Sequence, residues 1–243
     1  MKRALLSSIA CLSLGSSALA IDFGVGIGYT SLSPSGYVKY KGDTIDVKDD
    51  LNLGRSKKAY AYVDIGLPIL PDIKVEYFPV EYSGSNTLKR NITFRNKIYT
   101  VNSDVSSKVK LDQLDIASYY KFHTPFIKPR VGLAVKVVFA DIKLNSSTLG
   151  IYESKSLTAP IPLAYAGVYA EIPKTPFAFD VEAKGMAYSG NYFIDFKGLA
   201  MLKYKVLYAG VGYRYQKIKI DNISDTYSDL KFKGLTIETG LKF

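Results

Sequence analysis

The chain has 243 residues, a formal net charge of +10, 47% hydrophobic residues and 22% charged residues. That length allows one large domain or two small ones, and the composition excludes a disordered or low-complexity chain. No stretch reaches the roughly 18 consecutive apolar residues of a membrane-spanning helix, which excludes a helical membrane protein. With 20 Tyr, 12 Phe and 19 Gly, the composition favours strands and tight turns; one His and one Cys argue against a metal centre built from these ligands.

Residues 1–20 have the pattern of a secretory signal peptide. The basic pair Lys2-Arg3 precedes a short apolar run at 4–14, and Ala18-Leu19-Ala20 matches a cleavage site. An amphipathic first helix is the alternative, but the run has no polar face. We therefore expect one exported domain at 21–243. It would lack cysteine, and the loss of two basic residues would lower the net charge from +10 to +8.

From residue 21 onward, apolar residues alternate with polar or small ones at a period of two, as in half-buried strands. The first strand sets Phe23, Val25 and Ile27 against Gly24, Gly26 and Gly28. Pro79 predicts either a bulge or the end of pairing within the third strand. The pattern predicts about ten strands, with eight or twelve as alternatives, at 21–30, 58–67, 73–82, 111–122, 130–139, 159–171, 177–184, 191–202, 207–216 and 235–243.

The connections between these strands alternate between short and long, with Ser189-Gly190 as the exception. This sorting places the long connections at one end of the molecule. A Greek-key sandwich gives no reason for it, whereas an outer-membrane barrel has short periplasmic turns and long outer loops. We therefore predict an all-β, antiparallel, up-and-down transmembrane barrel. The short connections are 68–72, 123–127, 173–176 and 203–205; the long ones are 32–56, 83–110, 145–158 and 221–229.

Three features favour a barrel with its apolar face toward lipid over a soluble, exported, ligand-carrying barrel. The apolar faces are about five positions long, which suits the ~9–11 residues of a tilted membrane-crossing strand. Aromatic residues lie near the predicted strand ends, where interfacial girdles form. The final strand ends in phase with its apolar face, as in a signal read by the barrel assembly machinery; this predicted assembly signal comprises Leu235, Ile237, Leu241 and Phe243.

In these features the chain resembles the small outer-membrane β-barrel proteins of Gram-negative bacteria. It is similar in particular to a little-characterised group with a first loop like GYVKYKGDTIDVKDDLNLG. The matching segments are Gly36–Gly54, Leu67–Tyr77 and Leu235–Phe243. The resemblance implies the fold and the outer-membrane location, and it brings no catalytic residues with it.

If the apolar faces meet lipid, charged residues of both signs face the lumen. Isolated buried charges are costly, so they must pair or stay hydrated. Ten strands lie nearer the eight of a filled barrel than the 16–18 of a wide pore, which predicts a mixed-charge plug. The predicted lumen network comprises Asp22, Asp64, Glu76, Arg130, Lys136, Asp180, Glu182, Lys184, Arg214 and Glu238; Lys74, Asp115, Asp195, Lys197 and Lys242 share its face.

Two glycine stripes also face inward, one at Gly24, Gly26 and Gly28 and one at Gly210 and Gly212. Glycine weakens a strand, so stripes of it suggest that space is needed. We expect bulky neighbours to fill that space and to cross the lumen toward carboxylates such as Asp64 and Glu238. The expected neighbours are Tyr60, Tyr62, Arg130 and Arg214.

The sequence predicts no catalytic, cofactor or metal site. His123 lies in a short turn on the periplasmic side, away from the long loops. The acidic run Asp43, Asp46, Asp49 and Asp50 offers hard oxygen ligands for a divalent cation, but it lacks the spacing of a calcium loop. We interpret it as a solvated loop.

Basic residues predict a cationic rim at the outer end, suited to the phosphates of lipopolysaccharide. Nucleic acid is not an expected partner of an exported barrel. We expect a monomer, and segments 91–94 and 98–101 predict an external hairpin that extends the wall. The rim residues are Lys57, Lys58, Lys89, Arg90, Arg95 and Lys97.

Three functions follow as hypotheses. The first is a non-enzymatic barrel with a plugged lumen and an envelope-structural or surface-binding role. The second is a narrow passive channel for small or apolar solutes. The third is the soluble ligand-carrying barrel.

Overall fold

The computed structural model describes residues 21–243 apart from 95, 123 and 224. The predicted signal peptide, Arg95 and His123 therefore lie outside the described residues. No helix in the described part of the chain is long and apolar enough to cross a membrane.

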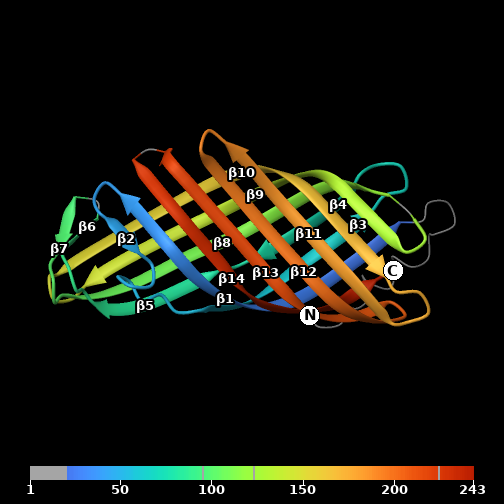
Figure 1. Ribbon diagram of the computed structural model, residues 1–243, viewed down its shortest axis with the longest axis horizontal. Helices are drawn as coiled ribbons and strands as arrows, with labels where there is room; N and C mark the ends of the chain where they lie inside the picture. The colour runs from blue at the N-terminus through green and yellow to red at the C-terminus, as the bar shows by residue number, and fades with distance from the viewer. Residues whose placement is uncertain (1–20, 95, 123, 224) are drawn as a thin grey trace, which may run out of the picture.

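Ten strands close into an antiparallel barrel, in which each pairs with its neighbours along the chain and the last pairs with the first (Figure 1). The predicted fold class and strand number are confirmed. The barrel strands are β1 (Asp22–Tyr40), β3 (Ser56–Gly66), β4 (Asp72–Phe78), β8 (Asp104–Lys121), β9 (Ile127–Ser146), β10 (Ile151–Glu171), β11 (Phe177–Tyr188), β12 (Asn191–Tyr204), β13 (Leu207–Ile223) and β14 (Thr226–Lys242).

Four shorter strands lie at one end of the barrel. β2 (Thr44–Asp46) pairs with the end of β1, and β5 (Glu81–Thr87) pairs with β8. β6 (Ile92–Phe94) and β7 (Lys97–Tyr99) form a separate hairpin beside β2 (Figure 1). We call residues 41–55 and 88–103, with β2, β6 and β7, the loop cap.

Pro79 separates β4 from β5 without a bulge. Both strands keep one register against β8 across the proline. The pairing of β4 with β3, in contrast, ends at Ala61 and Tyr77. Proline has no N–H to donate to a ladder, so of the two outcomes that the sequence allowed, the structure has the end of pairing.

The expected long loops are largely strand, which corrects the sequence-based boundaries. β1, β8, β9 and β10 contain 19, 18, 20 and 21 residues, about twice what a bilayer crossing needs. Where the strands project beyond the membrane, their outward side meets water. Polar residues such as Ser31, Ser33 and Ser35 then replace the apolar ones that marked the pattern, although the backbone pairing continues.

The outer wall is apolar while the inner wall is charged. On β9, Val131, Leu133 and Val135 are exposed on the outside, and the alternating Arg130 and Lys136 are buried inside. A soluble barrel that carries a ligand in an apolar interior would have the opposite arrangement. The wall therefore has the polarity of a barrel that meets lipid.

The closing strand yields a first prediction. Phe243 donates its backbone N–H to the carbonyl oxygen of Phe23 at 2.8 Å, and the two rings lie 6.4 Å apart. We expect that deleting Phe243 lowers the folded, heat-modifiable fraction in the outer membrane several-fold, because closure and the proposed assembly signal are both weakened. Phe122→Ala, at an exposed aromatic residue of the same end, is the control. Wild-type amounts of folded protein after the deletion would contradict the prediction.

Candidate functional site: the layered barrel interior

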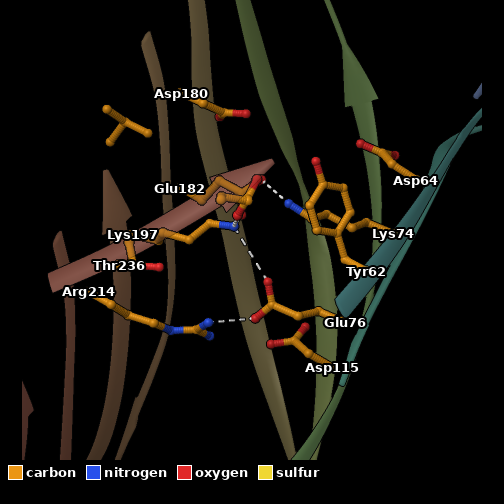
Figure 2. A network of polar contacts seen from close by, with 12 residues as sticks. Tyr62, Asp64, Lys74, Glu76, Asp115, Asp180, Glu182, Lys197, Arg214 and Thr236 are labelled. Atoms are coloured by element: carbon orange, nitrogen blue, oxygen red, sulfur yellow. Dashed lines mark hydrogen bonds and ion pairs between the residues drawn. The ribbon is translucent and has the colours of Figure 1, made fainter. Parts of the chain in front are cut away.

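The inward side chains of the middle of the barrel form a charged layer, part of which Figure 2 shows. Its members come from strands all around the barrel. Buried charged side chains of this layer are Lys74, Glu76, Asp115, Arg130, Lys136, Asp180, Glu182, Lys184, Asp195, Lys197, Arg214 and Glu238.

Arg214 of β13 links distant parts of the wall. Its Nη1 lies 2.7 Å from Glu76 Oε1 on β4, and its Nη2 lies 2.8 Å from Asp195 Oδ2 on the adjacent β12. In Figure 2 the side chains of Arg214 and Glu76 extend toward each other across the interior. The guanidinium carbon also lies 3.7 Å from the ring centroid of Phe78. One arginine therefore pairs with two carboxylates and covers an aromatic face.

Two lysines continue the network on the other side of Asp195. Lys136 Nζ lies 2.7 Å from Asp115 Oδ2 and 3.0 Å from Asp195 Oδ2. Lys184 Nζ approaches the same Asp115 oxygen at 2.9 Å. Gln113 accepts a hydrogen bond from Lys136 at 3.1 Å, so the Lys136 ammonium group has three oxygen partners.

A second group lies around Glu182. Lys74 contacts this carboxylate at 2.6 Å and Arg130 contacts it at 3.2 Å. Arg130 also pairs with Asp180. Within such a cluster, desolvated charges are held by ion pairs and by additional hydrogen bonds, which is the condition under which buried charges are tolerated.

Tyrosines complete the layer around Glu238. Tyr60 and Tyr208 donate to this carboxylate at 2.6 and 2.8 Å, and Tyr62 is hydrogen-bonded to Tyr208. Lys197 Nζ lies 3.0 Å from Glu238 and 3.5 Å from Glu76, which connects this group to Arg214.

The structure brings together eight of the ten residues of the predicted network and leaves two at the mouth beside the short turns, the end that the sequence predicts to be periplasmic. Asp22 is exposed and pairs with Lys121 at 2.7 Å; Asp64 accepts a hydrogen bond from Tyr119 at 2.7 Å. Sequence reasoning did not assign Gln113 and Tyr119 to the network. The sequence could have indicated them, because both alternate in phase with the inward-facing residues of β8.

The two glycine stripes serve different purposes. A Cβ on Gly28 would lie 2.2 Å from the Tyr60 ring, and one on Gly26 would lie 2.5 Å from the Tyr62 ring. Gly26 and Gly28 therefore leave the space that the rings of Tyr62 and Tyr60 occupy. At Gly212 of the second stripe the close neighbour is backbone instead of a bulky side chain, because a Cβ on this residue would meet the backbone oxygen of Gly198 at 1.9 Å.

An apolar layer lies between the charged layer and the loop cap, and the sequence analysis missed it. Inward residues of the barrel such as Leu32, Phe78 and Tyr82 pack there with cap residues. Its signal was the continued alternation through residues that were interpreted as loops. The cap contributes Ile45, Val47, Leu51, Leu53, Leu88, Ile92, Phe94 and Tyr99.

The expected external hairpin forms as β6 and β7, but it packs over the interior instead of extending the wall. Its strands belong to a two-stranded sheet of their own. Ile92, Phe94 and Tyr99 are buried in the apolar layer, and this burial outweighs the polar appearance of the segment.

The acidic run ties the loop cap together. Asp46 Oδ1 accepts the backbone N–H groups of residues 48 and 49, and Asp50 pairs with Arg90 at 2.5 Å. Hydrogen bonds from Thr93, first from its backbone N–H, lower the pKa of Asp43. The hydrogen bond with Asp50 raises the pKa of Arg90. These contacts hold the first loop against the hairpin.

No protein-family model matches the chain, and no curated protein matches its sequence. Among solved structures it is similar to Ail, the attachment invasion locus protein of Yersinia pestis in complex with the heparin analogue sucrose octasulfate, with 13% identity over 92% of this chain and 99% of that chain and a TM-score of 0.40. It is also similar to the translocator domain of the autotransporter NalP from Neisseria meningitidis, with 13% identity, coverage of 100% and 94%, and a TM-score of 0.43. A third similar structure is the outer membrane protein OprG from Pseudomonas aeruginosa. The identity is 10% over 93% of this chain and 97% of that chain, and the TM-score is 0.29.

These similarities are limited to the overall β-barrel architecture. The closed antiparallel barrel with an apolar outer wall and a charged interior is the structure of an integral outer-membrane β-barrel protein, and its location is the bacterial outer membrane.

The first glycine stripe yields a second prediction. We expect Gly28→Ala to lower the free energy of unfolding by about 1–3 kcal/mol, because the added methyl group displaces Tyr60 from Glu238. Gly24→Ala, on the same face of the same strand, is the control, since its Cβ would meet Asp64 at an ordinary 3.4 Å. Urea unfolding in lipid measures the free energy of unfolding of both variants. Equal free energies for the two would contradict the steric account.

Proposed function

We propose that this protein is a non-enzymatic outer-membrane barrel with a lumen closed to ions and an envelope-structural or surface-binding role. The observation that carries the proposal is the succession of two filled layers, one charged and one apolar, between the periplasmic mouth and the loop cap.

The small size of two cavities within these layers supports closure. The cavity between Glu76, Lys184 and Arg214 has a volume of about 10 Å³, and the cavity within the apolar layer is also about 10 Å³. Such a volume holds at most about one water molecule. An ion would need to displace a paired side chain in the first layer and to lose its hydration in the second.

Conductance across planar bilayers tests this proposal. We expect wild-type protein to give no steady ion current and Arg214→Ala to open a leak. The variant should also lose about 3–5 kcal/mol of stability, because Glu76 and Asp195 lose a buried partner. Arg55→Ala, at an exposed residue of the loop cap, should change neither property. A conducting wild type that Arg214→Ala leaves unchanged would contradict the proposal.

The second candidate is a narrow channel for small apolar solutes. The apolar layer favours it, because its lining of Leu32, Phe78 and Phe232 suits such a solute better than an ion. The charged layer beneath opposes it. Swelling of liposomes in an apolar solute, together with an absence of ion current, would favour this candidate over the first.

We propose lipopolysaccharide as a lipid partner, in addition to transient contact with the barrel assembly machinery, and a monomeric state. Lys217 and Lys231 are direct neighbours across β13 and β14, just beyond the apolar positions of both strands. Like charges at such positions destabilise a sheet. Within the described chain, neither Lys231 nor the exposed Lys233 forms an ion pair. Lipid phosphates would supply the missing negative charge.

A double variant tests this partner. We expect Lys231→Gln with Lys233→Gln to reduce by at least half the rise in melting temperature that added lipopolysaccharide produces, because two cationic contacts with its phosphates are lost. Lys174→Gln, in an exposed periplasmic turn, is the control. An undiminished rise in the double variant would contradict the assignment.

A further inference from the structure

The periplasmic mouth of the barrel contains a cavity of about 270 Å³, which we call the vestibule. It lies outside the two filled layers, with Arg130 of the charged layer in its wall. Residues of seven barrel strands line it, from Gly24 on β1 to Lys242 on β14. It is therefore enclosed by the ring of strands and separated from lipid by the barrel wall.

Cationic groups outnumber carboxylates in the lining of the vestibule. The lining includes five cationic side chains and three carboxylate side chains. The cationic ones are Lys121, Lys128, Arg130, Lys203 and Lys242, and the acidic ones are Asp22, Asp64 and Glu171.

Three of the ammonium groups surround one aromatic ring. The Nζ atoms of Lys242, Lys203 and Lys128 lie 4.8, 5.5 and 5.7 Å from the centroid of the Tyr169 ring. Like charges repel at such separations, and the ring offsets only part of this repulsion. The sequence placed these lysines near strand ends, but only barrel closure brings β9, β12 and β14 around one tyrosine of β10.

Carboxylates neutralise this cluster incompletely. Glu171 pairs with Lys203 at 2.5 Å and accepts a hydrogen bond from Tyr169. Asp180 lies 3.4 Å from Lys242 but is shared with Arg130. Within the described part of the chain, Lys128 forms no ion pair. Lys128 thus offers an unpaired ammonium group in a partly enclosed space.

We propose that the vestibule binds a compact soluble anion with phosphate or carboxylate groups, held by Lys128, Lys203 and Lys242 and entering from the periplasm. Ammonium groups bind such anions as point charges, without the fixed geometry of a guanidinium. The Tyr169 ring provides an apolar wall for the carbon skeleton of an organic anion. This site goes beyond the proposed closed lumen, because it lies at the mouth, outside both filled layers.

Calorimetric titration of the folded barrel in phospholipid-free detergent tests the site, with inorganic phosphate and citrate as probes. We expect saturable binding of at least one probe. Lys128→Gln should weaken it about tenfold, the effect of losing one charged contact. Lys174→Gln is the matched control, because this exposed lysine lies in a periplasmic turn outside the vestibule lining.

A heat-dependent shift in electrophoretic mobility establishes that each variant is folded. Lys203→Gln provides a second vestibule variant if Lys128→Gln does not fold. No saturable binding to wild-type protein would overturn the proposal, as would equal weakening by the vestibule and control variants. Repeating the citrate titration in phosphatidylglycerol and phosphatidylcholine bilayers tests the source of the anion. Equal affinity supports a soluble anion; loss of citrate affinity in phosphatidylglycerol alone would show that a lipid headgroup occupies the site.

Discussion

The buried guanidinium of Arg214 imposes the strongest constraint on this barrel. A charge in an interior surrounded by lipid is tolerated only with partners, and Glu76 and Asp195 supply them at 2.7 and 2.8 Å. Because these partners lie on β4 and β12, the arginine connects neighbouring and distant strands. Lys136 and Lys197 extend the same network from Asp195 and Glu76, so the charged layer acts as one connected unit.

The interior changes in character along the barrel. The open vestibule comes first, followed by the charged layer, the apolar layer and the loop cap. The apolar layer lies where the long strands project beyond the membrane and where the cap supplies residues such as Leu51 and Phe94 to fill the lumen. The ion pair between Asp50 and Arg90 holds the first loop of the cap against the second on its outer side. The barrel therefore combines a membrane protein's polarity in one part with a soluble protein's apolar core in the other.

The period-two pattern predicted the fold and the strand number. It also predicted that side chains such as those of Arg130 and Glu182 point into the barrel. It did not reveal individual partners across the lumen, because these depend on barrel closure: Arg214 pairs with Glu76, whereas the carboxylates named as examples were Asp64 and Glu238. Strand ends were missed where outward residues turn polar. The apolar layer was missed for the same reason, since inward residues such as Leu32 and Val105 lie in segments that were interpreted as loops.

The central claim is that the pair of Glu76 and Arg214 ties opposite parts of the wall together through the lumen. A double-mutant cycle measures this directly, with urea unfolding in lipid of wild type, Glu76→Gln, Arg214→Met and the double variant. The account predicts a coupling free energy within about 0.5–3 kcal/mol, with the double variant less destabilised than the sum of the single variants. Additive losses would show that the two side chains do not stabilise each other and would contradict the account.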